Sequence, residues 1–437
     1  MPDEIPAGVQ DDEREREEKK DERGVASGEW RAAKDERGVA SGEGMTNDEG
    51  RASGAMAMTI RVRPKFVFMF TSRLFQRSCH RLRLGDGLES LFQSRDDDWE
   101  VFAFTPTGGQ LYPSYDWSIL TTLAWVNNNT AMCVAHEHGR RAVSLAKVDA
   151  NKLASADEQE LDEMATGIAT DAYVRFLDGV NFDVETPTPS ATSALSTNYV
   201  RLIEKTSRLL KSWSPDGDAQ ISVDVAWSPG GIDGRWYANS KLVEVADVVF
   251  IMAYDMQSQN MQSRCVAGAN SPYELVRHGL AQWIALTGNE TARNKLVLGL
   301  PWYGYKYPCV WLGGTTYDPS SPPLCSLKSV PFRGASCSDA AGAQLGLAEI
   351  VSLSQMSNAS KIRVDASSRS PAFEVQNTQI WFDSATSLAL KVQLARAFGL
   401  RGVGMWHVDA LQGLSDKEMA AMWNALAADS NDVQVKK

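Results

Sequence analysis

The sequence predicts an α/β protein: a (β/α)8 TIM barrel with an inserted α+β lobe after its seventh strand and a disordered N-terminal extension. From residue 98 onward, short β-rich runs alternate with longer amphipathic runs, the pattern of successive βα units. The β-rich runs number eight, as this closed barrel requires. They are mostly apolar throughout, as parallel strands covered on both faces should be. An open doubly wound sheet is the alternative, and the absence of a Gly-x-Gly-x-x-Gly turn after any run disfavours it.

The expected elements follow from the apolar runs and from helix-start signals. One helix is expected to begin at Ser155, where Glu158 completes a capping box, and another at Ser384. The last helix is expected at residues 416–427. Residues from about 304 to 378 interrupt the βα pattern with Ser, Pro, Gly and three cysteines, which predicts the inserted lobe. The strands are expected at residues 100–105, 120–126, 142–147, 179–185, 220–227, 248–254, 296–301 and 402–408.

The domain organisation follows from shifts in composition. Residues 1–55 hold 16 acidic and 9 basic residues and repeat DERGVASGE at 21–29 and 35–43, so they are predicted to be a disordered acidic repeat segment. Residues 56–96 form a basic segment, interpreted either as a targeting sequence or as a gene-model artefact. The barrel domain is expected at residues 97–430, followed by a short tail at 431–437.

Charge and composition narrow the range of partners. The net charge is −11, from 44 basic and 55 acidic residues, which disfavours a nucleic-acid partner. No run of 18 apolar residues occurs, so no membrane partner is expected. Cys133, His136 and His138 do not share one face of a helix, so we expect no metal, and the absence of a glycine-rich phosphate loop predicts no cofactor. We expect a monomer.

The cysteines and glycosylation sequons indicate a secretory compartment. Six cysteines and three Asn-x-Ser/Thr sequons occur in the chain. We expect a disulfide between Cys325 and Cys337, whereas Cys79 and Cys133 are equally compatible with free buried thiols. The protein is therefore expected to enter the secretory pathway.

The densest functional signal is the run Asp178-Gly-Val-Asn-Phe-Asp-Val-Glu185 on the fourth expected strand. The period of two along a strand places Asn181, Asp183 and Glu185 on one face, which opens at the top of the barrel. Two carboxyl groups side by side do not ionise equally. The negative charge of one raises the pKa of the other, and burial raises the pKa of both. The run therefore supplies one acid and one base, as glycoside hydrolysis requires.

This run resembles the DGxDxDxE signature of family 18 glycoside hydrolases. Met252-Ala-Tyr-Asp255 and Gly404-Met-Trp406 resemble that family's sixth- and eighth-strand motifs. The segments DVAWSP (224–229), LPWYGYKY (300–307) and VPFRGASCSDAAG (330–342) are similar to its di-N-acetylchitobiase branch, as is Asn181 in place of an aspartate. The resemblance extends from about residue 97 to residue 428. Lys306 departs from it, because an acidic residue is expected there.

The resemblance implies a retaining mechanism assisted by the substrate's own N-acetyl group. Glu185 is expected to protonate the leaving oxygen, Asp183 to stabilise the charged acetamido group, and Tyr254 to donate to the acetyl oxygen. The expected partners are N-acetylglucosamine oligosaccharides, including the chitobiose core of N-linked glycans. Such substrates imply a lysosome- or vacuole-like compartment or a secreted protein. Further substrate-binding residues are expected at Trp406, Asn181, Asp178, Asp255, Gln257, Asp224 and Trp302.

Three other functions fit parts of the same pattern. A chitinase acting on longer chains shares the motifs, and so does a bacterial-type cell-wall glycosidase, although that class is expected to lack the cysteine segment 325–342. A catalytically inactive chitin-binding lectin is expected to have lost the acid, whereas Glu185 is present.

Overall fold

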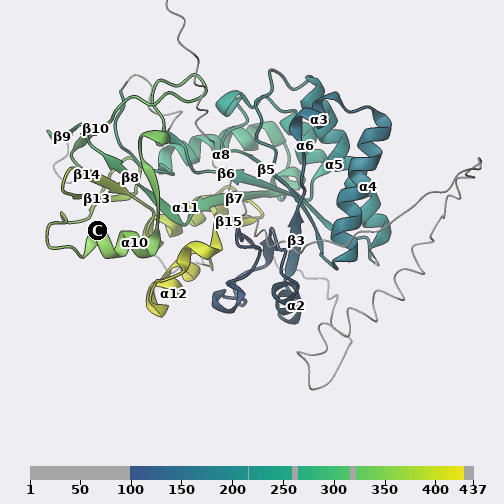
Figure 1. Cartoon of the computed structure of the whole chain (residues 1–437), viewed down its shortest axis with the longest axis horizontal. Coiled ribbons are helices and arrows are strands. Elements are labelled where there is room, and N and C mark those ends of the chain that lie inside the picture. The colour runs from purple at the N-terminus through teal and green to yellow at the C-terminus, as the bar shows by residue number, and fades with distance from the viewer. Residues whose placement is uncertain (1–98, 215, 258–263, 315–320, 428–437) are drawn as a thin grey trace, which may run out of the picture. The chain divides into compact units, whose positions relative to one another are not determined.

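Eight parallel strands close into a barrel, as the sequence predicts (Figure 1). The computed structural model describes residues 99–214, 216–257, 264–314 and 321–427. Around the barrel the strands follow the order β1-β15-β7-β6-β5-β4-β3-β2. Strands that are consecutive in the chain are therefore neighbours in the barrel, except that β8 to β14 belong to other sheets. The barrel strands are β1 (Glu100–Phe104), β2 (Thr122–Ala124), β3 (Arg141–Leu145), β4 (Gly179–Phe182), β5 (Gln220–Ala226), β6 (Val248–Met252), β7 (Leu296–Pro301) and β15 (Gly402–Trp406).

Helices connect most of these strands and pack around the barrel (Figure 1). The link between β1 and β2 is the exception, because it contains only the short 3-10 turn η3 (Tyr112–Ser114). The remaining helices are α2 (Asn129–Glu137), α3 (Ala150–Ser155), α4 (Glu158–Val174), α5 (Ala194–Trp213), η4 (Ile232–Gly234), α6 (Asn239–Val245), α8 (Tyr273–Thr287), α9 (Glu290–Arg293), α11 (Ala385–Ala397), η6 (Val408–Leu411) and α12 (Asp416–Ala427).

The helix starts confirm two expectations and correct one. Ser384 is the N-cap of α11, and α12 covers the predicted residues. The capping box expected at Ser155 lies two residues later: Asp157 accepts from the backbone of Glu160, whose side chain accepts in return. Ser155 instead is the last residue of the short preceding helix α3, so it cannot be the N-cap of the next helix.

The core has two layers, one on each side of the strands. Inside the barrel, Phe102, Phe104 and Phe250 are fully buried and contact one another, with ring centroids 4.7 to 5.6 Å apart. Outside the barrel, the alternate strand residues pack against the surrounding helices. Leu298 of β7, for example, is part of this outer core. Side chains alternate along each strand, so every second residue points into the barrel, as these phenylalanines do. The last inward-pointing residues of each strand therefore line the barrel opening.

An inserted lobe follows β7, as predicted (Figure 1). Its main sheet has five antiparallel strands in the order β11-β8-β14-β13-β12, and a second sheet pairs β10 with β9. Since β8 begins two residues after β7 ends, the lobe lies beside the carboxyl end of the barrel. Its elements are β8 (Tyr303–Pro308), β9 (Trp311–Gly313), β10 (Leu324–Ser326), η5 (Asp339–Ala341), β11 (Ala343–Gly346), α10 (Leu347–Ser354), β12 (Arg363–Val364), β13 (Pro371–Val375) and β14 (Thr378–Trp381).

The disulfides differ from the expected pairing. Cys325 of β10 pairs with Cys309, which lies between β8 and β9, and Cys337 pairs with Cys265 in the segment after β6. The expected Cys325–Cys337 bridge was wrong because short sequence separation does not report which backbone segments lie side by side. Cys133 is disulfide-bonded rather than a free thiol. Cys79 lies outside the described residues.

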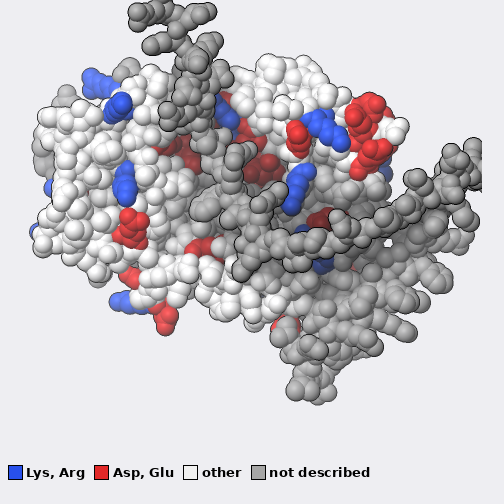
Figure 2. Space-filling model, in the orientation of Figure 1, with Lys and Arg blue, Asp and Glu red and all other residues white. Residues whose placement is uncertain are grey.

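Several expectations concern parts of the chain that the structure does not describe. The acidic segment 1–55, the basic segment 56–96 and the tail 431–437 all lie outside the described residues, and their boundaries stay predictions. Among the helices that are described, none has the length and apolar character needed to cross a bilayer. On the face drawn in Figure 2, acidic side chains gather in the region where Figure 1 labels β5 and β6, with basic side chains beside them.

Candidate active site

The carboxyl end of β4 presents the two acidic residues expected to be catalytic. The strand ends at Phe182, so Asp183 and Glu185 lie just beyond its last ladder residue. Asp183 continues the inward alternation of Asn181 and is partly buried, whereas the side chain of Glu185 is 50% exposed. The two carboxyl groups therefore share one end of the barrel but have different access to water.

Asp183 lies in surroundings that favour its neutral form. Burial raises the pKa of this carboxyl to about 8, with a further contribution from the negative charge of Glu185, while the positive charge of Arg235 opposes both. Its Oδ1 is buried and has no hydrogen-bond partner in the described part of the chain. A carboxyl group in this state holds a proton at neutral pH and leaves one acceptor free for a ligand.

Asn181 connects three neighbouring side chains inside the barrel. Its Oδ1 accepts from Nε1 of Trp125 at 2.8 Å, and its Nδ2 donates to Oγ of Ser222 at 3.1 Å and to Oδ1 of Asp224 at 2.9 Å. Burial raises the pKa of Asp224, and the charge of Asp183 raises it further. Asn181 thus bonds Asp224 and Ser222, and no hydrogen bond joins it to Asp183 in the described part of the chain.

Glu185 is held by a cation from the loop after β5. Its Oε2 accepts from Nη1 of Arg235, whose Nη2 lies 3.3 Å from Oδ2 of Asp233. The backbone carbonyl of Glu185 accepts from Nη1 of Arg333, which belongs to the lobe, at 3.4 Å. The exposed carboxyl group therefore lies between the barrel loops and the lobe.

Tyr254 lies beside the acidic cluster, two residues beyond the end of β6. It is 9% exposed and makes an edge-to-face contact with Tyr303. Burial raises its pKa well above the usual range, as do the charges of Asp224, Asp183 and Glu185 in that order. The hydroxyl group therefore keeps its proton and has no hydrogen-bond partner among the described residues, so it is available as a donor.

Aromatic rings close the inner end of the site. Trp406, the last residue of β15, lies 4.9 Å from Trp125 and 5.6 Å from Phe104 between ring centroids. Trp406 is partly exposed, and Trp125 adopts a left-handed backbone conformation with φ of 69° just after β2. An apolar ring with one open face is suited to the face of a sugar.

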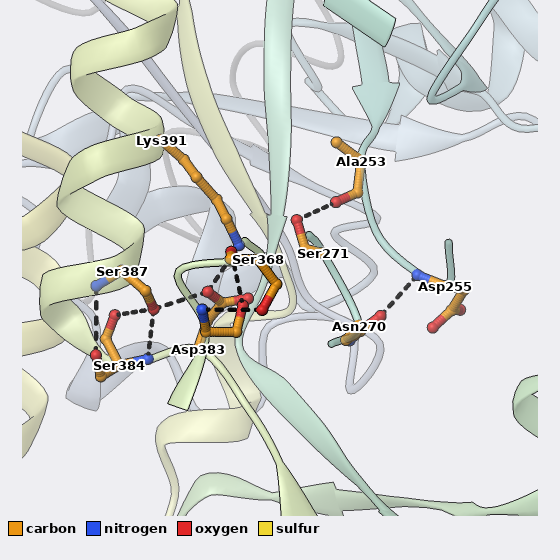
Figure 3. A network of polar contacts seen from close by, with 10 residues as sticks. Ala253, Asp255, Asn270, Ser271, Ser368, Asp383, Ser384, Ser387 and Lys391 are labelled. Carbon is orange, nitrogen blue, oxygen red and sulfur yellow. Dashed lines mark hydrogen bonds and ion pairs between the residues drawn. The ribbon is translucent and has the colours of Figure 1, made fainter. Parts of the chain in front are cut away.

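Asp255 is fixed in place by hydroxyl and amide groups. Tyr303 and Tyr305 both donate to its Oδ1, at 2.6 and 2.9 Å. Its backbone N–H donates to Oδ1 of Asn270 at 2.7 Å, and Ser271 beside Asn270 donates to the carbonyl of Ala253 (Figure 3). The residue as a whole is exposed. The protein atoms packed around its carboxyl group nevertheless raise the pKa of that group, while the two tyrosine hydroxyls lower it.

Comparison with known proteins identifies the family. The model of the glycosyl hydrolases family 18 matches residues 154–410. The chain belongs to this family. It is 33% identical over 347 residues to "Di-N-acetylchitobiase" of Homo sapiens, covering 75% of this chain and 84% of the human protein. It is 36% identical over 331 residues to "Probable di-N-acetylchitobiase 2" of Dictyostelium discoideum, covering 72% and 83%. The chain is therefore a family 18 glycoside hydrolase homologous to di-N-acetylchitobiases.

Solved structures share the family 18 barrel. The Ostrinia furnacalis Group IV chitinase in complex with allosamidin has a TM-score of 0.60 at 16% identity, covering 75% of this chain and 98% of that one. A mutant of the Nicotiana tobaccum Class V chitinase in complex with NAG4 has a TM-score of 0.59 at 16% identity, covering 76% and 99%. These likenesses concern the fold.

Three residues expected to bind substrate make their described contacts with other groups. Asp178 precedes β4, at the opposite end of the strand, where it bonds Nε2 of His136 and the backbone N–H of Ala142. Trp302 is fully buried and packs against Trp423, with ring centroids 5.0 Å apart. Gln257 is buried and donates to the carbonyl of Val266. None of the three side chains bonds Asp183, Glu185 or Tyr254 in the described part of the chain.

Other residues at the site were missed from the sequence. Trp125 directly follows β2, and Arg235 lies in the loop after β5. Their positions after the carboxyl ends of barrel strands could have identified them from the sequence. Tyr303 and Tyr305 alternate along β8 on the face that meets Asp255. In the described part of the chain no group of three or more His, Cys, Asp or Glu is arranged to hold a metal ion.

Proposed function

We propose that the chain hydrolyses β-1,4-linked N-acetylglucosamine with retention of configuration, by substrate-assisted catalysis. The observation that carries this proposal is the pairing of a partly buried carboxyl group, Asp183, with an exposed one, Glu185, beside the free hydroxyl group of Tyr254. Trp406 and Trp125 supply an apolar platform on the inner side. These are the parts needed to bind an acetamido sugar and to protonate its leaving group.

The raised pKa of Asp183 disfavours a mechanism with a carboxylate nucleophile. A retaining glycosidase of that type needs an ionised carboxylate beneath the anomeric carbon. A carboxyl group whose pKa is about 8 is protonated in most molecules at neutral pH and is a poor nucleophile. The acetamido oxygen of the substrate is a neutral nucleophile that needs only positioning and a neighbouring acceptor.

The proposed reaction has two steps. In the first, the proton that the pair shares passes from Asp183 to Glu185, which donates it to the glycosidic oxygen and leaves Asp183 as a carboxylate. The bond from that oxygen to C1 breaks, and the acetyl oxygen bonds C1 to form an oxazolinium ion. Asp183 accepts from the acetamido N–H and balances the positive charge, while Tyr254 donates to the acetyl oxygen. In the second, Glu185 takes a proton from water as that water attacks C1 and reopens the ring.

The proposed substrates are short chitooligosaccharides and the chitobiose core of N-linked glycans. The names of the relatives in Homo sapiens and Dictyostelium discoideum support a disaccharide substrate. We propose a lysosome- or vacuole-like or secreted location, where such glycans are degraded, and the described disulfides support an oxidising compartment.

Time-resolved product analysis tests the proposal. Reducing-end-labelled N,N′-diacetylchitobiose and chitotetraose are incubated with the full chain, and the anomer first formed is followed by NMR. We expect release of single reducing-end N-acetylglucosamine from both substrates and initial formation of the β-anomer. Internal cleavage to dimers indicates a chitinase, and saturable binding without cleavage indicates a lectin. Glu185→Gln should bind both sugars and abolish turnover, because it removes only the transferable proton.

A further inference from the structure

Arg235 is the buried cation that contacts the proposed acid. Its side chain is 10% exposed, and its Nη1 pairs with Oε2 of Glu185. The same guanidinium group is anchored on its other side, by Nη2 to Oδ2 of Asp233 at 3.3 Å and by Nε to the carbonyl of Ile232 at 3.3 Å. A guanidinium group remains charged throughout the accessible pH range, so its free N–H groups stay strong donors.

The backbone around Arg235 fixes this group independently of Glu185. The N–H of Thr188 donates to the carbonyl of Gly234 at 2.9 Å, and the N–H of Trp236 donates to the carbonyl of Thr188 at 3.2 Å. Tyr237 donates through its hydroxyl group to the carbonyl of Thr186 at 2.7 Å. The loop after β5 is therefore joined to the segment that follows Glu185, and Arg235 stays in place when the Glu185 side chain turns.

Because Arg235 pairs with Glu185, the side of the substrate that Glu185 contacts is also the side next to Arg235. An acid that protonates the glycosidic oxygen lies on the leaving-group side of the bond being broken. The exposed Arg333 of the lobe lies on the same side, because its Nη1 reaches the carbonyl of Glu185 at 3.4 Å. When Glu185 turns towards the glycosidic oxygen, Nη1 of Arg235 loses its carboxylate partner next to the leaving sugar. An unpaired buried guanidinium group is costly, so a sugar oxygen that replaces the carboxylate is favoured.

We propose that Arg235 is a specificity-determining residue that binds the reducing-end N-acetylglucosamine, the leaving group of the reaction. Its Nη1 exchanges the carboxylate of Glu185 for a hydroxyl or acetamido oxygen of that sugar, while Asp233 keeps the guanidinium group anchored. Arg333 forms the outer wall of the same subsite. This inference rests on the proposed function, and it adds a preference for substrates whose leaving group is a sugar.

Binding to an inactive background tests the inference without the chemical step. Titration calorimetry compares E185Q with E185Q/R235M, using N,N′-diacetylchitobiose and methyl N-acetyl-β-D-glucosaminide as probes. Both probes fill the subsite of the sugar that is attacked, but only the disaccharide has a reducing-end ring. Loss of a charge-assisted hydrogen bond should weaken disaccharide binding by about tenfold to a hundredfold and methyl glycoside binding by less than about threefold.

Matched variants separate this role from a structural one. E185Q/R235K keeps the charge and one donor, so it should recover part of the disaccharide affinity. E185Q/R333M changes an exposed side chain and should show a smaller loss that is again confined to the disaccharide. Equal weakening of both probes, or no weakening of either, in the variants that keep the melting temperature of E185Q overturns the inference. Hydrolysis of diacetylchitobiose by the unmodified chain reports separately on the proposed function.

Discussion

The carboxyl pair at the end of β4 sets the alkaline limit of activity, and Asp183→Asn tests this. Burial and the charge of Glu185 raise the pKa of Asp183 to about 8, against the opposing charge of Arg235. One proton is then shared by two carboxyl groups at neutral pH, and its loss belongs to the pair. A pair without that proton has no general acid, so activity should fall as the pH rises through about 8.

The slope of the pH profile and the shift expected in each variant follow from which groups raise or lower the pKa of Asp183. Above the midpoint, kcat/KM should fall about tenfold per pH unit, because one proton is lost. Asp183→Asn removes the neighbour that shares the proton, so the alkaline limb should move to lower pH. The variant also removes the anion beside the oxazolinium ion, which should lower kcat by about 10²- to 10³-fold. Arg235→Met removes the charge that lowers the pKa of Asp183, so its limb should move to higher pH.

The assay is kcat/KM for N,N′-diacetylchitobiose between about pH 4 and pH 9, which reports on the free enzyme. Lys306→Met is the control, because the ammonium group of Lys306 lies on the lobe 3.6 Å from Glu349 and should leave the limb unchanged. The reasoning is refuted if Asp183→Asn keeps its alkaline limb near pH 8. It is equally refuted if Arg235→Met moves the limb to lower pH.

Three further predictions concern stability and substrate binding. Lys391 and Asp383 form a fully buried ion pair at 2.7 Å (Figure 3), so K391M should lower the free energy of unfolding in urea by about 3–5 kcal/mol and K391M/D383A by clearly less. The Cys265–Cys337 disulfide joins residues 72 apart, so C265S/C337S should lose about 4 kcal/mol in thermal unfolding, and an unchanged melting temperature contradicts this. W406A should lower kcat/KM for diacetylchitobiose by about tenfold or more while W406F loses less, and equal losses argue against a stacking role.

The barrel could be predicted because its strands are buried on both faces. Continuous apolar runs locate all eight strands, but several predicted ends overshoot. The run at 179–185 pairs only as Gly179–Phe182, because Asp183 and Glu185 extend beyond the strand ladder into the opening. The run at 120–126 pairs only as Thr122–Ala124, because the left-handed backbone of Trp125 turns the chain away. The sequence thus predicts which residues of a strand are buried more reliably than which of them form hydrogen-bonded pairs with the next strand.

The site could be predicted only where strand periodicity carries the information. Alternation along β4 placed Asn181 and Asp183 on the inner face, and the structure agrees. Proximity to a motif carries less information: Asp178 is five residues from Asp183 but lies at the other end of the strand. Trp302 follows β7 directly but packs into the outer core. The direction of a side chain beyond the last ladder residue depends on tertiary contacts that no local pattern contains.

Asn181 shows why an amide suits the centre of this cluster. The position must accept from Nε1 of Trp125 and donate to Oδ1 of Asp224, and an amide does both. A carboxylate accepts the first bond but cannot donate the second without a proton. A carboxyl group there would also be a further titrating group beside Asp183 and Asp224, whose pKa values burial already raises. The amide therefore orients Trp125 and Asp224 while leaving the single shared proton to Asp183 and Glu185.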